Sequence, residues 1–149
     1  MDKPARILVV DDNESVRDTM KAILESEGYV VDCAVTGKEA IKKTQETTYN
    51  LALIDIRLPD MEGVELLKLM KDAVPRTRKI IITSYPTMQN AVLALNSNAD
   101  AYLVKPLNME KLLEAIKDQL QLQADEREYG DMKVAEFIES RVKELNAVL

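Results

Sequence analysis

The sequence predicts an α/β fold in which a doubly wound, five-stranded parallel sheet carries helices on both faces and a helical extension follows at the C-terminus. Short apolar runs alternate along the chain with stretches of 3.6-residue periodicity, the pattern of strands and amphipathic helices. The connections between them are short, so the strands are expected to be parallel and joined by right-handed helical crossovers. The first, third and fourth runs are apolar almost throughout, which is typical of strands that helices cover on both faces.

The predicted elements follow one another in a regular order. The strands are expected at residues 6–10, 29–34, 51–54, 79–83 and 101–104. Five helical stripes alternate with them and are carried by Val16, Met20, Ile23 and Leu24, by Ala40, Ile41 and Thr44, by Val64, Leu67 and Met70, by Ala91, Val92 and Leu95, and by Met109, Leu112, Leu113, Ile116 and Leu120. Gly28 is predicted to end the first helix as a left-handed cap.

The pattern changes near residue 123, and we therefore predict a domain at residues 1–122 and a helical extension or linker at 123–149. Residues 124–131 are polar and include Gly130. A narrow apolar stripe then returns at the spacing of a coiled-coil seam, at Ala135, Ile138, Val142, Leu145 and Leu149. A homodimer through this stripe is one hypothesis. The alternatives are that the stripe folds back on its own domain with Gly130 as a hinge, or that it begins a longer helix of a larger protein.

Composition narrows the function classes. The 149 residues include 26 acidic and 20 basic side chains, a formal net charge of −6, whereas direct binding of nucleic acid needs a clustered basic face. No apolar run approaches the roughly 18 residues that a membrane span needs. A single cysteine, Cys33, fits a reducing compartment, so we expect a cytoplasmic protein. The chain has no histidine, which excludes histidine metal ligands and Ser-His or Cys-His catalysis.

Polar side chains of complementary chemistry follow four of the predicted strands. Asp11 and Asp12 follow the first strand, Asp55 the third, Thr83 ends the fourth and Lys105 follows the fifth. The carboxyl ends of parallel strands meet at one mouth, so these groups are expected to converge there. Three carboxylates about 5 Å apart repel one another by roughly 3 kcal/mol per pair at an effective dielectric near 20, which favours an offsetting cation. Oxygen ligands select Mg²⁺ or Mn²⁺, and one carboxylate would remain free to attack phosphorus.

Each residue alone has a simpler interpretation. An aspartate before a helix is commonly an N-cap, and Asp55 before a proline-containing loop could be a turn residue. Thr83 could simply favour a strand, Tyr102 could simply pack one, and Gly63 is interpreted as a loop or helix-entry residue without chemistry. The combination of strand ends is what favours a functional site over these readings.

Four ordered segments resemble the signature segments of receiver domains of two-component response regulators. They are Ile7-Leu-Val-Val-Asp-Asp12, Leu53-Ile-Asp-Ile-Arg-Leu-Pro-Asp-Met-Glu-Gly63, Ile81-Ile-Thr-Ser84 and Ala101-Tyr-Leu-Val-Lys-Pro106. The resemblance runs from about residue 5 to about residue 121. It implies a flavodoxin-like sheet with strand order 2-1-3-4-5, a cis Lys105–Pro106 bond, and a phosphoacceptor protein rather than a true enzyme, one that assists its own phosphorylation and dephosphorylation.

The resemblance also implies a role for each site residue. Asp55 would accept a phosphoryl group from the phosphohistidine of a sensor histidine kinase. Asp12, Asp55 and the backbone carbonyl of Arg57 would bind Mg²⁺ directly, and Asp11 would act chiefly through a bound water. Lys105 would contact the phosphoryl group and Thr83 would hydrogen-bond it. Tyr102 would be the aromatic residue whose rotamer follows Thr83.

Three competing functions can be weighed on the same residues. A haloacid-dehalogenase-type phosphatase requires a second acidic residue two positions after its nucleophile, but the residue two positions after Asp55 is Arg57. A flavodoxin-like electron carrier would want a hydroxyl- and glycine-rich phosphate loop after the first strand, but Asp11-Asp-Asn-Glu14 is anionic. A degenerate receiver that only binds proteins would not need all five functional positions filled. A downstream output protein or domain is expected as a partner, and the sequence does not say which one.

Overall fold

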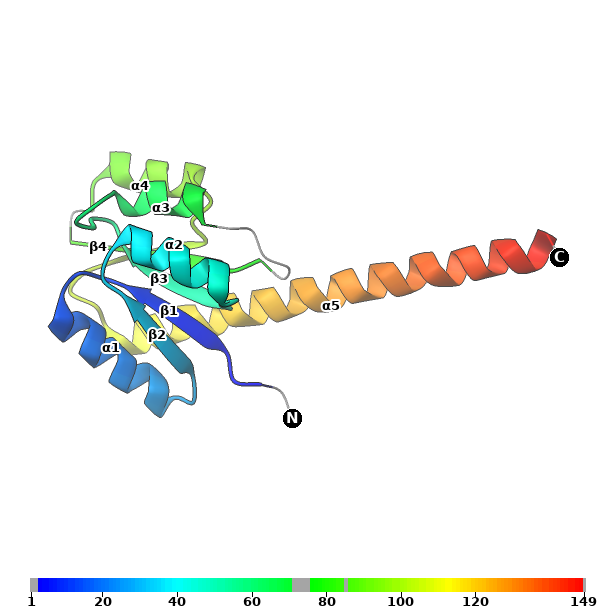
Figure 1. Ribbon diagram of the computed structural model, residues 1–149, viewed down its shortest axis with the longest axis horizontal. Coiled ribbons are helices and arrows are strands. Elements are labelled where there is room, and N and C mark those ends of the chain that lie inside the picture. The colour runs from blue at the N-terminus through cyan, green and yellow to red at the C-terminus, as the bar shows by residue number, and fades with distance from the viewer. Residues whose placement is uncertain (1–2, 71–75, 85, 149) are drawn as a thin grey trace.

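The computed structural model describes residues 3–70, 76–84 and 86–148, and these form a five-stranded sheet enclosed by helices with one long helix projecting from it (Figure 1). Along the chain the elements are β1 (Arg6–Val10), α1 (Glu14–Ser26), β2 (Val30–Ala34), α2 (Gly37–Glu46), β3 (Leu51–Asp55), α3 (Gly63–Leu69), β4 (Arg78–Thr83), α4 (Met88–Asn96), β5 (Ala101–Val104) and α5 (Met109–Val148). The α/β alternation predicted from the sequence is confirmed.

The sheet is parallel throughout and has the order β2-β1-β3-β4-β5. This confirms the predicted doubly wound topology, in which the chain reverses direction across the sheet after β2. Three strand boundaries differ from the prediction by one residue, because β2 begins at Val30, β3 ends at Asp55 and β4 begins at Arg78. Arg78 pairs in register with Leu51, and its charged side chain is buried through ion pairs with Asp100 and Glu126.

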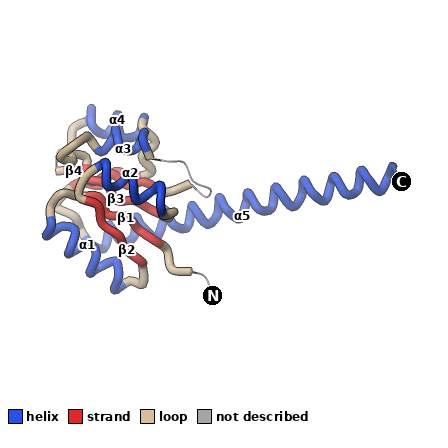
Figure 2. The backbone as a smooth tube through the Cα atoms, in the orientation of Figure 1, coloured by secondary structure: helices blue, strands red, loops and turns tan. Residues whose placement is uncertain are grey.

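Helices cover both faces of the sheet, as Figure 2 shows. One face packs against α1 and α5, whose buried side chains include Met20, Leu24, Leu112 and Ile116. The other face packs against α2, α3 and α4 through residues such as Ala40, Leu66 and Ala94. Because each central strand is apolar on both sides, β1 and β3 are buried almost throughout.

Local signals in the sequence set the helix ends and the loops around the site. Asn13 caps α1, with its side chain accepting a hydrogen bond from the Val16 amide at 3.1 Å. Gly28 has φ +94° just after α1, so the predicted left-handed cap is confirmed. The Lys105–Pro106 peptide bond is cis, as the resemblance implied.

The C-terminal extension differs from the prediction, because it is not separated from the helix before it. The fifth predicted helix and the separate C-terminal stripe are one continuous helix, α5, which runs from Met109 to Val148. Gly130 lies inside this helix and is not a hinge, and Ile138, Val142 and Leu145 remain exposed instead of folding back on the domain. The last residue of the stripe, Leu149, lies outside the described residues. The division at residue 122 stays a prediction.

Polar contacts fix α5 to the amino-terminal edge of the sheet just where the extension leaves it. Gln123 is buried, and its amide group donates hydrogen bonds to the carbonyl oxygens of Asn50 at 2.9 Å and Arg76 at 2.7 Å. The Asn50 side chain in turn donates to the Gln123 side-chain oxygen at 3.0 Å. Among the described residues, no helix combines the length and the apolar character needed to cross a bilayer.

Candidate functional site

The predicted site residues lie at the carboxyl edge of the sheet, where β1, β3, β4 and β5 end side by side. Backbone hydrogen bonds join this edge beyond the strands: the Ile56 amide donates to the Ile82 carbonyl at 2.9 Å, and the Lys105 amide donates to the Thr83 carbonyl at 2.7 Å. The geometry therefore confirms that the strand ends converge on one mouth.

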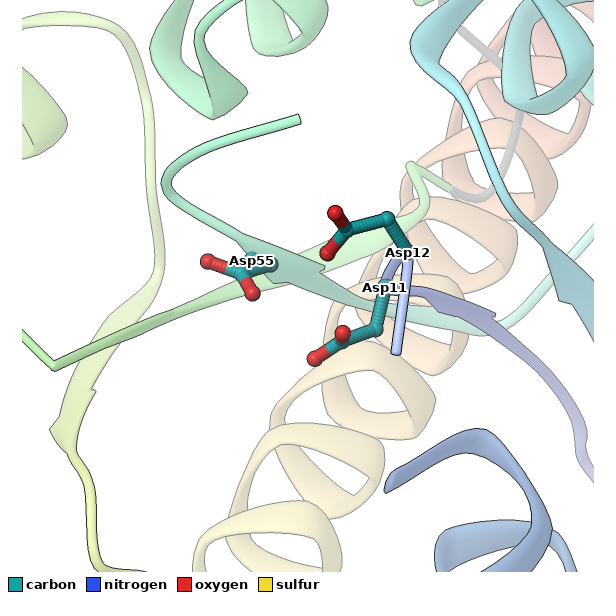
Figure 3. A group of neighbouring side chains, drawn as sticks. All are labelled: Asp11, Asp12 and Asp55. Atoms are coloured by element: carbon teal, nitrogen blue, oxygen red, sulfur yellow. The ribbon is translucent and has the colours of Figure 1, made fainter. Parts of the chain in front are cut away.

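Three carboxylates meet in this mouth, as Figure 3 shows. One oxygen from each of Asp11, Asp12 and Asp55 lies within 4.8 Å of the others. Asp11 is buried, Asp55 is half-buried and Asp12 is exposed. The group is thus a pocket with one open side.

Lys105 supplies positive charge to the inner two carboxylates. Its Nζ lies 3.2 Å from an Asp11 oxygen and 3.3 Å from an Asp55 oxygen. Burial by itself lowers the pKa of Lys105, but the charges of Asp11 and Asp55 outweigh it and hold the pKa above its ordinary value. Lys105 therefore stays charged at neutral pH.

Two hydrogen bonds hold Asp11 in place, one to its side chain and one to its backbone carbonyl. Its Oδ1 accepts a hydrogen bond from the Asn13 amide at 2.9 Å, and its own carbonyl accepts one from Arg17 at 2.9 Å. Burial raises the pKa of the Asp11 carboxyl, and the neighbouring Asp55 charge adds to that effect; the Asn13 amide and Lys105 oppose it without reversing it. An ionised Asp11 is consequently costly in this pocket unless further positive charge is present.

The donor set of the mouth fits a hard divalent cation. All three clustered side chains offer carboxylate oxygens, the ligands that Mg²⁺ and Ca²⁺ prefer, and Lys105 balances only part of their charge. Asp12 is exposed, so water can reach the group and complete a coordination shell. The structure thus provides a place for the predicted metal.

Two further predicted residues, Thr83 and Tyr102, lie beside the mouth. Thr83 is fully buried at the end of β4, next to the residue that pairs with Asp55. Tyr102 pairs with Ile81 and packs against the core on the α2–α4 face, on the same side of the sheet as Thr83. Its hydroxyl oxygen is buried without a hydrogen-bond partner in the described part of the chain. Tyr102 therefore belongs to the core behind the site and not to the mouth itself.

Two residues of the segment between β3 and α3, Arg57 and Gly63, support the site through their backbones. The Arg57 amide donates to Asp55 Oδ1 at 3.1 Å, so the backbone of this loop helps to fix the Asp55 carboxylate. Gly63 was interpreted as a helix-entry residue without further significance. A Cβ at this position would collide with the Asp55 carbonyl and would lie 3.0 Å from the Ile56 Cα. Glycine is therefore required for α3 to begin against the end of β3, and no periodic pattern in the sequence marks this requirement.

Comparison with known proteins identifies the family. The family model for the response regulator receiver domain matches residues 7–117. The chain belongs to this family. A curated relative, the transcriptional regulatory protein ZraR of Klebsiella oxytoca, is 42% identical to this receiver over 106 residues, which cover 71% of this chain and 24% of that protein. The receiver thus spans about a quarter of the length of this relative. A second relative, the regulatory protein AtoC of Escherichia coli, is 34% identical over 123 residues, which cover 83% of this chain and 27% of that protein.

Solved receiver structures have the same fold. A CheY-like receiver domain protein of Methanospirillum hungatei is 47% identical and aligns with a TM-score of 0.78 over 83% of this chain and 98% of that one. The beryllofluoride-activated NtrC4 receiver domain dimer is 37% identical, with a TM-score of 0.74 over 79% of this chain and 98% of that one. A Burkholderia pseudomallei response regulator with a phosphorylated aspartic acid and a calcium ion is 32% identical, with a TM-score of 0.69 over 82% of this chain and 72% of that one.

Proposed function

We propose that this receiver is a phosphorylation-dependent signalling switch of a two-component phosphorelay and that Asp55 is its phosphoacceptor. The observation that carries the proposal is the placement of the Asp55 carboxylate, half-buried between Lys105 at 3.3 Å and the pair Asp11–Asp12. This arrangement places a nucleophilic oxygen, an ammonium group and a group of carboxylates that could hold a cation in one mouth. Phosphoryl transfer depends mainly on such positioning of the reacting groups and on charge compensation.

Mg²⁺ is the cation we assign to the acidic pocket. Asp12, Asp55 and the Arg57 carbonyl would bind it directly, and Asp11 would hold it through a water molecule. When bound, Mg²⁺ would neutralise charge on the incoming phosphoryl oxygens. The oxygen-only donor set supports a hard cation, and the structure of the related Burkholderia protein contains a calcium ion as well as a phosphorylated aspartic acid.

In the proposed transfer, a sensor histidine kinase presents its phosphohistidine to the mouth. An Asp55 oxygen forms a bond to phosphorus while the bond from phosphorus to the imidazole nitrogen breaks, and the imidazole leaves and takes up a proton from solvent. Lys105 would pair with one phosphoryl oxygen and Thr83 would donate a hydrogen bond to another. The unpartnered hydroxyl of Tyr102 in the described structure is consistent with a side chain that changes rotamer when Thr83 moves.

The partners follow from the same proposal. We propose a cytoplasmic protein that receives its phosphoryl group from a kinase and passes the signal to an output protein or domain, without itself binding nucleic acid. Its relatives ZraR and AtoC are named as regulatory proteins, and the receiver matches only about a quarter of each. A homodimer through the exposed stripe of α5 is part of the proposal; the related NtrC4 receiver also forms a dimer when activated by beryllofluoride.

Transfer of labelled phosphate tests the proposed role of Asp55. The purified chain, incubated with ³²P-acetyl phosphate and Mg²⁺, should become labelled, and the label should be lost in Asp55→Asn and in chelator. Asp18→Asn, an exposed position on α1 away from the mouth, is the matched control and should label normally. Equal labelling of the wild type and Asp55→Asn would refute the assignment. No labelling of any variant would favour a receiver that acts only by binding proteins.

A further inference from the structure

The segment that follows Asp55 forms a small hairpin at the rim of the mouth. Arg57 and Glu62 form an antiparallel bridge, and the Leu58 amide donates to the Met61 carbonyl at 3.1 Å between them. The hairpin closes where the Gly63 amide donates to the Ile56 carbonyl at 2.7 Å. It carries Arg57, whose amide holds Asp55 and whose carbonyl is a proposed metal ligand, so its position affects two groups of the site at once.

Asp60, at the tip of this hairpin, joins it to a different part of the fold. Its Oδ1 accepts a hydrogen bond from the Gly37 amide at 2.8 Å and its Oδ2 accepts one from the Lys38 amide at 2.9 Å. These are the first two amides of α2, whose helix dipole favours a negative charge at this end. The two amides lower the pKa of Asp60, against a smaller opposing effect of burial, so the link is anionic at neutral pH.

The contact between α2 and the hairpin is close as well as polar. A Cβ at Gly37 would lie 2.6 Å from Cγ and 2.7 Å from Cε of Met61, so the start of α2 rests directly on the hairpin. On its other side α2 follows β2, and the Ala34 carbonyl at the end of β2 accepts a hydrogen bond from the Asp11 amide at 3.1 Å. The start of α2 thus lies between the strand end that carries Asp11 and the hairpin that follows Asp55.

Asp60 is not the N-cap residue of α2. Thr36 already caps α2, with its hydroxyl accepting a hydrogen bond from the Glu39 amide at 3.1 Å, and the Glu39 side chain accepts one from the Val35 amide at 3.0 Å. Thr36 and Glu39 thus satisfy the amides of Glu39 and Val35, and Asp60 satisfies those of Gly37 and Lys38. The two bonds to Asp60 therefore differ in kind, because they tie the helix to a loop 22 and 23 residues further along the chain.

We propose that Asp60 is a positioning residue of the phosphoacceptor site: by fixing the β3–α3 hairpin to the start of α2, it holds the Arg57 backbone and the Asp55 carboxylate in the arrangement that binds the divalent cation. The inference rests on the proposed function, since it concerns the affinity of the same metal pocket. It makes Asp60 important to the metal although its own carboxylate points at α2 and contributes no ligand.

Calorimetric titration of Mg²⁺ into the full chain tests the proposal, with Asp60→Ala compared with Thr36→Ala. Both variants remove hydrogen bonds from the start of α2, but only the first releases the hairpin. Asp60→Ala should raise the Mg²⁺ dissociation constant by roughly 3- to 30-fold, toward the range found when groups that orient a metal ligand are removed. Thr36→Ala should leave the dissociation constant within about twofold while lowering the melting temperature, because it removes only a cap.

The outcomes separate the possible failures. If Asp60→Ala and Thr36→Ala change Mg²⁺ affinity equally, Asp60 is only a second cap and the inference is overturned. If Asp60→Ala does not fold by circular dichroism, Asp60→Asn decides, since it keeps one acceptor oxygen and should weaken Mg²⁺ binding by a smaller factor; an unchanged dissociation constant overturns the inference. If the wild type binds no Mg²⁺, the metal site of the proposed function is itself wrong and the inference falls with it.

Discussion

The crowding of carboxylates at the mouth predicts that Asp12→Asn stabilises the protein in the absence of metal. Asp11 and Asp55 share Lys105, whereas Asp12 has no ion pair within the described ranges. At 4.8 Å, each repulsion of Asp12 by another carboxylate amounts to about 1 kcal/mol in water and about 3.5 kcal/mol at an effective dielectric of 20. Asp12 is exposed, so the lower limit applies more closely, and we expect a total gain of about 1–3 kcal/mol for the two pairs.

Thermal unfolding in chelator and in Mg²⁺ measures this effect. In chelator, Asp12→Asn should melt about 3–9 °C above the wild type, at about 3 °C per kcal/mol for a chain of this size. Mg²⁺ at a hundred times its dissociation constant should stabilise the wild type by about 2.7 kcal/mol through mass action. The variant should gain much less, because it lacks a proposed ligand. Mg²⁺ should therefore reduce the difference between the two melting temperatures or reverse its sign.

Asp18→Asn is the control, since it changes the net charge by the same amount on an exposed part of α1 away from the mouth. It should leave the melting temperature within about 1 °C in both buffers, as surface substitutions usually do. The reasoning is refuted if Asp12→Asn melts at or below the wild-type temperature in chelator. The assignment of Asp12 as a metal ligand is refuted if both proteins gain equally from Mg²⁺.

Three further predictions concern the fold and its extension. Asp100→Asn should cost about 2 kcal/mol in urea unfolding at pH 7. Burial opposes the ionised form of Asp100, but its hydrogen bonds to Arg76 and the Lys79 amide lower its pKa below the usual 3.8, so the deficit should fade as the pH drops through that lowered value. A deficit that grows as the medium is acidified below pH 3.8 would contradict this. Gly63→Ala should destabilise by about 1–3 kcal/mol because its Cβ meets backbone, whereas Gly130→Ala, in open space on α5, should stabilise by about 0.5–1 kcal/mol; equal effects would be inconsistent with the structure. Light scattering should find a dimer for the full chain and a monomer for a version ending at Gln123, and a monomer in both cases at tens of micromolar would exclude the dimer.

The sequence predicted the sheet well because its signals are local and repeated. Each strand is a short apolar run bounded by a helix with its own stripe and cap, so the order of elements needs no knowledge of distant contacts. The one-residue error at β4 shows where this reasoning stops. Arg78 looks like the polar residue before a strand, yet it pairs with Leu51 inside the sheet because Asp100 and Glu126 balance its charge.

The candidate site was predictable to the extent that topology alone brings its residues together. In a parallel sheet the carboxyl ends of adjacent strands must meet, and so Asp11, Asp12, Asp55 and Lys105 converge as expected. The supporting residues were not predictable in this way. Asp60 acts through amides 22 and 23 residues away, and Gly63 is required by the distance between two backbones, neither of which leaves a periodic pattern in the sequence.

The helix continues past residue 123 because a polar stretch with a glycine does not by itself end a helix. Gly130 costs only about 1 kcal/mol in a helix, a penalty that the neighbouring helix formers can absorb. Gln123 is buried by its hydrogen bonds to Asn50 and Arg76, and Glu126 pairs with Arg78, so α5 is fixed to the base of the receiver as it leaves it. A partner that covers the exposed stripe farther along this helix would therefore be held in a defined orientation to the sheet. The helix begins at Met109 beside Lys105 at the carboxyl edge of the sheet and reaches the amino-terminal edge at Gln123. An effect of phosphorylation on such a partner would therefore be transmitted along α5 itself and through the core that it shares with β1, β3 and β4.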